Sequence, residues 1–100
     1  MPFQEIDISK IINEKCNSDP EFATTYKHAI AELDLIAQII KTRKEKGLTQ
    51  EDVAERSGLT QQMISRIERK EILPNYRNLL RIADALDSKL QLVTTPRTKA

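Results

Sequence analysis

The chain has 100 residues, enough for one domain or for one small domain with an arm, which excludes two full hydrophobic cores. Leu, Ile, Val and Phe account for 26 residues, more than a disordered chain carries, and two Gly with four Pro disfavour a turn-rich β-sandwich and favour helices. The net charge of +1 is misleading: residues 1–40 carry three Lys and seven acids, and residues 41–82 carry ten Lys or Arg and six acids. An acidic segment before a basic one indicates either two binding surfaces, the basic one suited to phosphate, or two solvated helix faces.

Two helices are predicted in the first half of the chain. The first covers residues 9–17 and places Ile8, Ile11 and Ile12 on one side. Asp19 can cap the second helix, because the proline that follows it suits the first helical position. This second helix is expected to be long, since apolar residues then recur at steps of three or four: Phe22, Tyr26, Ile30, Leu33, Ala37 and Ile40.

The long helix is expected to run to about Lys46 and to stop at Gly47, a natural residue for the left-handed turn after a helix. Two short helices should follow, one capped by Thr49 and running to about residue 56, the other capped by Thr60 and running through about residue 69.

A further helix is predicted to begin at Pro74-Asn75 and to run through Leu86. After it, Leu90 and Leu92 alternate with polar neighbours, so residues 89–95 are predicted to form a short strand.

The two short helices carry the spacing of a helix-turn-helix. Ala54 is small where the helices would cross, and four residues later Gly58 can adopt the left-handed conformation that the turn needs. Ile64 and Ile67 follow at plus ten and plus thirteen and would point inward with Val53 and Leu59. Such a motif places its second helix in the major groove of DNA.

The segments Arg43–Ala54, Gly58–Gln62 and Ile64–Glu68 resemble the Cro/lambda-repressor-like (XRE) helix-turn-helix family. The resemblance covers about residues 35–87. It implies an all-α fold, a lambda-repressor-like five-helix bundle that binds operator double-stranded DNA as a homodimer. It also implies a structural ion pair between Arg43 and Glu68 and a phosphate contact by Gln50.

Four side chains on the second short helix are the candidates for base contacts. Gln can match adenine N6 and N7, and Arg can match guanine O6 and N7. The four share one face because Ile64 and Ile67 face the core, although an ordinary solvated helix face would look similar. The candidate base contacts are Gln61, Gln62, Ser65 and Arg66.

Phosphate contacts are expected from basic side chains around the motif and from the free N–H groups at the start of the helix near residue 75. Lys70 stands where a Gly often ends the second helix in the family, which leaves the path of the next loop open. With Gln50, the candidate phosphate contacts are Lys44, Lys46, Arg69, Lys70, Asn75, Tyr76, Arg77 and Asn78.

An acidic arm precedes the motif. Its Asp19-Pro20-Glu21-Phe22 run, followed by Tyr26, resembles the arm of HigA-type antitoxins, which neutralise RelE-like HigB toxins that cleave mRNA. An acidic arm suits a basic toxin because opposite charges favour encounter and orientation. The resemblance implies these toxin-binding residues: Phe3, Ile8, Ile11, Ile12, Asp19, Glu21, Phe22 and Tyr26.

Alternatives remain for the arm. The apolar stripe could extend the protein's own core or its dimer seam, and the strand at residues 89–95 could pair with its twofold mate or with a toxin sheet. The predicted organisation is a toxin-binding or dimerisation arm at residues 1–33, a DNA-binding domain at residues 34–88, and a strand with a tail at residues 89–100.

The predicted function is an antitoxin that binds a HigB-like toxin, as a heterotetramer, and represses its own operon. The main alternative is a free-standing XRE-family repressor whose arm only dimerises; another is an adaptor that does not read DNA. We expect no enzyme, metal or cofactor, because His28 and Cys16 have no partners at catalytic or ligand spacing. A lone cysteine, no signal peptide and no membrane span favour a cytoplasmic protein.

Overall fold

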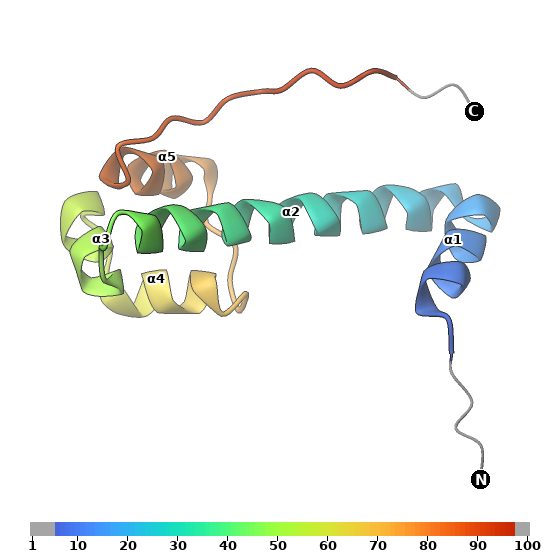
Figure 1. The fold of residues 1–100 in the computed structure, drawn as a ribbon, viewed down its shortest axis with the longest axis horizontal. Helices are drawn as coiled ribbons and strands as arrows, with labels where there is room; N and C mark the ends of the chain where they lie inside the picture. The colour runs from blue at the N-terminus through green and yellow to red at the C-terminus, as the bar shows by residue number, and fades with distance from the viewer. Residues whose placement is uncertain (1–5, 98–100) are drawn as a thin grey trace, which may run out of the picture. The chain divides into compact units, whose positions relative to one another are not determined.

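The computed structural model describes residues 6–97, which contain helices and no strand (Figure 1). The chain divides into two compact units, an N-terminal unit of residues 1–35 and a bundle unit of residues 36–100, and the second helix runs from one into the other. The helices in the described residues are α1 (Ile8–Ser18), α2 (Pro20–Glu45), α3 (Gln50–Ser57), α4 (Gln61–Glu68) and α5 (Tyr76–Ala85).

Side-chain caps begin both helices of the N-terminal unit. The Asp7 carboxylate accepts the N–H of Lys10 at 3.1 Å, and Asp19 Oδ1 accepts the N–H groups of Glu21 and Phe22 at 3.1 and 3.2 Å. The predicted cap at Asp19 is therefore confirmed. Capping fixes where these helices start, but α1 contains no buried residue, so it contributes no core of its own.

The core lies in the bundle unit, where α3 packs against both α4 and α5. In Figure 1, α4 and α5 lie on the two sides of the end of α2, and α3 closes the bundle. Burial of a large aliphatic side chain stabilises a fold by roughly 1.5–3 kcal/mol, so this cluster dominates the stability. The buried apolar residues are Ile36, Ile39, Val53, Ala54, Ile64, Ile67, Ile82, Ala83, Ala85 and Leu86.

The apolar stripe predicted on α2 is not the face that packs in the core. The buried residues of α2 are Ile36 and Ile39, whereas Ala37 is exposed and Ile40 is half-buried. One residue turns a helix by about 100°, so a contact face shifted by one position leaves the predicted stripe at its edge. Farther back, Ile30 and Leu33 are exposed as well.

The predicted strand at residues 89–95 is wrong. No described residue from 89 to 97 lies in a helix or strand, and Leu92 and Val93 are 98% and 78% exposed. Alternating apolar residues alone do not make a strand, because a strand needs a neighbour to take up its backbone hydrogen bonds. The family resemblance implies a bundle of five helices. In the described residues, the bundle unit contains the end of α2 with α3, α4 and α5, and the fifth helix, α1, belongs to the N-terminal unit.

Candidate nucleic-acid interface and partner surface

The turn between α3 and α4 is built by three small residues. Gly58 has φ +74°, in the left-handed region that L-residues adopt at a cost, and Ala54 is 6% exposed where α3 meets its neighbours. Ser57, which the sequence reasoning did not single out, donates its Oγ hydrogen to the Ala54 carbonyl at 3.2 Å and accepts the Leu59 N–H at 3.3 Å. This buried hydroxyl, directly before the Gly, ties the last turn of α3 to the residue that follows the Gly.

Helix α4 has a buried and an exposed side. Thr60 caps its start by accepting the N–H of Met63 at 3.1 Å, and Ile64 and Ile67 are 2% and 1% exposed. The predicted base-contacting side chains fall on the remaining surface. Gln61, Gln62 and Arg66 are exposed and Ser65 is half-buried.

An ion pair joins the end of α2 to the end of α4. Arg43 Nε and Nη2 donate to the two carboxylate oxygens of Glu68 at 2.8 and 2.9 Å, and both side chains are nearly buried, 12% and 6% exposed. Arg43 Nη1 also donates to the Leu48 carbonyl at 2.9 Å. Gln50 Nε2 donates to Glu68 at 3.2 Å, which ties the start of α3 to the same carboxylate.

The predicted phosphate contacts have different surroundings. Lys46 Nζ lies 3.6 Å from the Asp87 carboxylate, and Arg69 lies 3.2 Å from that of Glu71. The other basic members, Lys44, Lys70 and Arg77, are exposed.

Side chains at the start of α5 make hydrogen bonds within the protein. Asn75 Oδ1 accepts the Asn78 N–H at 2.8 Å, and Asn78 Nδ2 donates to Met63 Sδ of α4 at 3.8 Å. Tyr76 is 71% exposed beside them. One free N–H at this terminus is thus already satisfied within the protein, while the tyrosine ring remains accessible.

Lys70 takes the backbone conformation usually left to Gly. Its φ is +65°, its N–H donates to the Ile67 carbonyl at 3.0 Å, and the Glu71 N–H donates to the Arg66 carbonyl at 2.9 Å. These two bonds end α4 in a Schellman motif. The loop therefore follows the path that a Gly would allow, and it brings back Glu71, a residue that the sequence reasoning missed.

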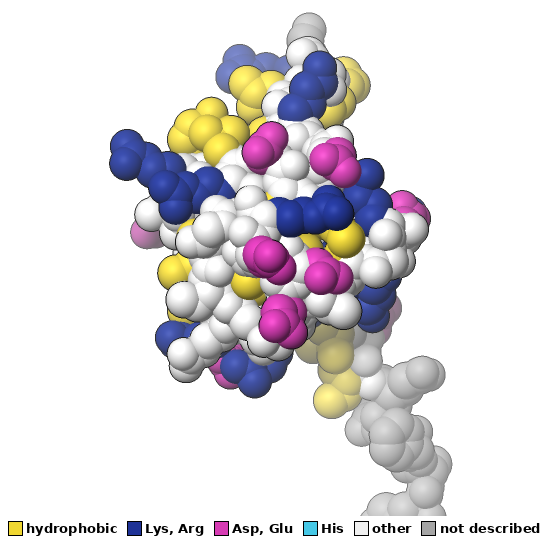
Figure 2. Space-filling model, turned by 90° about the vertical axis from the view of Figure 1, so that its left-hand side faces the viewer, with side chains coloured by type: hydrophobic (Ala, Val, Ile, Leu, Met, Phe, Trp, Pro, Cys, Tyr) yellow, Lys and Arg dark blue, Asp and Glu magenta, His cyan; other side chains and the backbone are white. Residues whose placement is uncertain are grey.

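Charge is mixed on the face over α3. Figure 2 shows acidic side chains gathered near the middle of this face, with basic ones around them. Helix α3 supplies exposed Glu51 and Glu55 and the half-buried Asp52. The pKa of the Asp52 carboxyl is lowered, chiefly because it accepts the backbone N–H of Thr49 at 2.8 Å. Such a face does not attract phosphate as the basic side chains beside α4 would.

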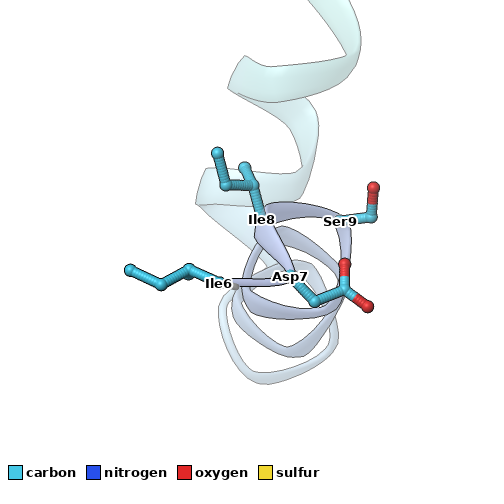
Figure 3. Close-up of a pocket in the computed structure, with 4 residues that line it drawn as sticks. All are labelled: Ile6, Asp7, Ile8 and Ser9. Atoms are coloured by element: carbon cyan, nitrogen blue, oxygen red, sulfur yellow. The ribbon is translucent and has the colours of Figure 1, made fainter. Parts of the chain in front are cut away.

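The N-terminal unit presents apolar side chains to solvent. Figure 3 shows Ile6 and Ile8 on one side of the start of α1, with Asp7 and Ser9 on the other. Ile6, Ile8 and Ile11 are 69%, 65% and 55% exposed. A cleft of about 350 Å³ lies beside them between α1 and α2, lined by Ser9, Ile12, Asn13, Cys16 and Tyr26.

Aromatic and charged groups flank this cleft. The rings of Phe22 and Tyr26 stack with centroids 6.2 Å apart, and the Lys15 ammonium lies 5.9 Å from the Phe22 centroid and 3.7 Å from the Asp19 carboxylate. Glu21 is exposed at the start of α2. Phe3, also predicted to bind the toxin, lies outside the described residues.

The described residues contain neither a candidate membrane span nor a candidate metal site. None of the helices there is long and apolar enough to cross a membrane. Nor do residues 6–97 bring together three His, Cys, Asp or Glu side chains in a way that could hold a metal ion.

Comparison with known proteins identifies similar sequences. Residues 39–93 match the family model described as helix-turn-helix. Two proteins named Antitoxin HigA1, from the CDC 1551/Oshkosh and H37Rv strains of Mycobacterium tuberculosis, are each 36% identical over 87 residues, 87% of this chain and 58% of the relative. The uncharacterized HTH-type transcriptional regulator y4dJ of Sinorhizobium fredii is 47% identical over 55 residues, 54% of this chain and 71% of that protein.

The chain thus spans 58% of the length of the two antitoxins that it matches. No solved structure gives a significant match. The two resemblances predicted from the sequence, to helix-turn-helix proteins and to HigA-type antitoxins, are confirmed by these similarities.

Proposed function

We propose, from the premise that this chain belongs to the helix-turn-helix family, that it is an antitoxin with two separate tasks. Its bundle unit binds operator DNA as a dimer and represses its own operon. Its N-terminal unit binds and neutralises a RelE-like, HigB-like toxin that cleaves mRNA. The observation that carries the proposal is that each unit presents a different unpartnered surface, a polar face of α4 and an apolar, acidic N-terminal unit.

The DNA-binding task rests on the two-sided character of α4. Because Ile64 and Ile67 anchor the helix in the core, the side chains of Gln61, Gln62 and Arg66 project from the opposite side. Amide and guanidinium groups can each form two parallel hydrogen bonds with a base edge in the major groove. We propose that these three side chains, with Ser65, read the operator.

Phosphate contacts would hold α4 in register on the duplex. The proposed contacts surround α4 and come from the ends of α2 and α4 and the start of α5. Gln50 would take part through the N–H that its bond to Glu68 leaves free. The other proposed contacts are Lys44, Lys46, Arg69, Lys70, Asn75, Tyr76, Arg77 and Asn78.

The toxin-binding task rests on exposed apolar groups within an acidic unit. Residues 6–35 carry six acids and three Lys. Ile8, Ile11 and the cleft lined by Ile12 and Tyr26 offer apolar contacts, and Asp19 and Glu21 offer charges at the rim. A ribonuclease that binds RNA is expected to be basic, so the charges would guide its approach while apolar burial supplies affinity.

Substitution of both glutamines tests the DNA-binding task. Gln61→Ala with Gln62→Ala should abolish the preference for a duplex from the chain's own promoter over a random duplex, while thermal unfolding stays unchanged. Gln91→Ala, an exposed glutamine outside α4, is the matched control and should retain the preference. Unchanged preference in the double variant would disprove the assigned base contacts.

Substitution of two isoleucines tests the toxin-binding task. Ile8→Ala with Ile11→Ala should leave operator binding intact but lose capture of a HigB-like toxin and the rescue of cells from that toxin. The control, Lys10→Ala with Asn17→Ala, changes polar side chains of the same helix and should behave as wild type. If the isoleucine variant still neutralises the toxin, α1 is not its docking surface.

A free-standing repressor is the second candidate, favoured by the similarity to the transcriptional regulator y4dJ over the bundle unit. In that case α1 would join two copies of the chain. Analytical ultracentrifugation distinguishes the antitoxin from the free-standing repressor. If the chain is a free-standing repressor, the isoleucine variant should become monomeric and lose operator affinity, and the wild type should bind no toxin.

A further inference from the structure

We propose that Glu71 sets the DNA selectivity of α4, by positioning the Arg66 guanidinium and by opposing contact with phosphates that any sequence would offer. This inference rests on the DNA-binding task proposed above. Glu71 does not itself contact a base in this proposal. It is a positioning residue that acts through Arg66.

The geometry joins Glu71 to α4 at three points. Its N–H donates to the Arg66 carbonyl at 2.9 Å. Its Oε2 atom lies 3.5 Å from Arg66 Nε and 3.2 Å from Arg69 Nη2. One carboxylate oxygen therefore bridges the two guanidinium groups at the end of the helix that would enter the groove.

The left-handed residue before Glu71 creates this arrangement. With φ +65° at Lys70, the chain reverses direction immediately after α4, so residue 71 returns toward residue 66. L-residues other than Asn and Asp adopt this conformation rarely. The fold thus maintains an uncommon backbone conformation at the point that brings the carboxylate back to Arg66.

The ion pair has a direct consequence for Arg66. Its Nε side is turned to Glu71, which leaves the two terminal Nη groups for an outside partner. Guanine O6 and N7 accept two neighbouring N–H groups from such a fork. Because a positioned side chain loses less conformational entropy on binding, the pair favours the matching base.

The same carboxylate affects binding to every other sequence. The two guanidinium groups alone would present two positive charges to a phosphate backbone, and Glu71 offsets one of them. The phosphate term is the same for any sequence, so this loss is shared by both kinds of duplex, but only operator binding gains from the positioned Arg66. Glu71 would therefore widen the ratio between operator and random DNA.

Glu71→Gln tests the proposal, with affinity measured at several salt concentrations for a duplex from the chain's own promoter and for a random duplex of equal length. Affinity for the random duplex should rise about fivefold, with a salt dependence steeper by about one phosphate contact, and promoter affinity should change less than twofold. The side chains are 46–60% exposed, so thermal unfolding should not change.

Two controls separate positioning from a general effect of charge. Glu55→Gln removes an exposed carboxylate from α3 and should shift both duplexes alike. In an Arg66→Ala background, Glu71→Gln should raise affinity for both duplexes by the same factor, because only its effect on charge remains. Equal factors for both duplexes in the single variant would overturn the role of Glu71 while leaving DNA binding intact. A wild type that does not distinguish the duplexes would overturn both proposals.

Discussion

Both units of this chain are helical, but they differ in how far they bury their apolar side chains. Among residues 6–97, the ten buried apolar residues all lie from position 36 to position 86, in the bundle unit. In the described part of the N-terminal unit, by contrast, α1 buries nothing, and Ile6, Ile8, Ile11, Ile30 and Leu33 are all more than 40% exposed. Amphipathic sequence alone therefore does not make a core. Apolar side chains on a helix that do not pack against the rest of their own chain remain available to bind a partner.

Truncating an isoleucine to alanine should change the free energy of unfolding far more in the bundle unit than in the N-terminal unit. Ile67→Ala removes a fully buried side chain of α4 and should lower the free energy of unfolding by about 2–5 kcal/mol. Ile11→Ala makes the same chemical change on α1 and should cost less than about 0.5 kcal/mol. Urea denaturation of both variants checks this, and equal losses would show that α1 packs in a core of its own.

The stability lost when an ion pair is broken should also depend on how buried the pair is. Glu68→Ala leaves Arg43 nearly buried without its bidentate partner and should cost about 3 kcal/mol, measured by urea denaturation. Glu45→Ala removes the partner of Lys41, a pair 4.0 Å apart with side chains 77% and 63% exposed, and should cost less than about 1 kcal/mol. A small effect at Glu68 would mean that the pair does not join α2 to α4 in solution.

A change from Lys to Gly should have opposite signs at two positions of the bundle unit. Lys70→Gly relieves a left-handed backbone and should stabilise the protein by about 0.5–1 kcal/mol after the entropy of Gly is counted. Lys41→Gly, within α2, should destabilise it by about 1 kcal/mol. Thermal unfolding of both variants gives the comparison, and a loss at Lys70 would contradict its backbone assignment.

Acid should weaken the start of α3 by a small amount. Asp52 accepts the Thr49 N–H and donates its own N–H to Thr49 Oγ1, and its pKa is lower in the folded chain than in the unfolded one. The resulting stability is complete above the unfolded pKa, about 3.9, and disappears as the pH falls through the lower folded value. Asp52→Asn should lack this part of the acid dependence in pH-jump or equilibrium unfolding curves. Identical curves for variant and wild type would contradict it.

Much of the fold follows from local sequence. Caps at Asp19, Thr49 and Thr60 and left-handed turns at Gly47 and Gly58 depend on neighbouring backbone groups, so short-range chemistry predicts them. The inward side of α4 also follows from the spacing of its isoleucines. The same reasoning therefore located the exposed side of α4, where the candidate base contacts lie.

Other features needed the whole fold. The side of α2 that packs in the core depends on where α3, α4 and α5 meet this helix. Ala37 and Ile39 point in directions one hundred degrees or more apart, and the apolar periodicity alone does not tell which of them faces the core. The predicted strand failed for a related reason, because Leu90 and Leu92 need a neighbouring strand that residues 36–97 do not supply.

The sequence by itself determined the helices, their caps and the polar side of α4, because each of these depends on residues within a few positions of one another. Only the tertiary structure decided which side of α2 packs in the core, and that Ile8 and Ile11 of α1 remain exposed. Both outcomes depend on contacts made, or not made, in three dimensions, and residue spacing along a chain does not encode such contacts directly.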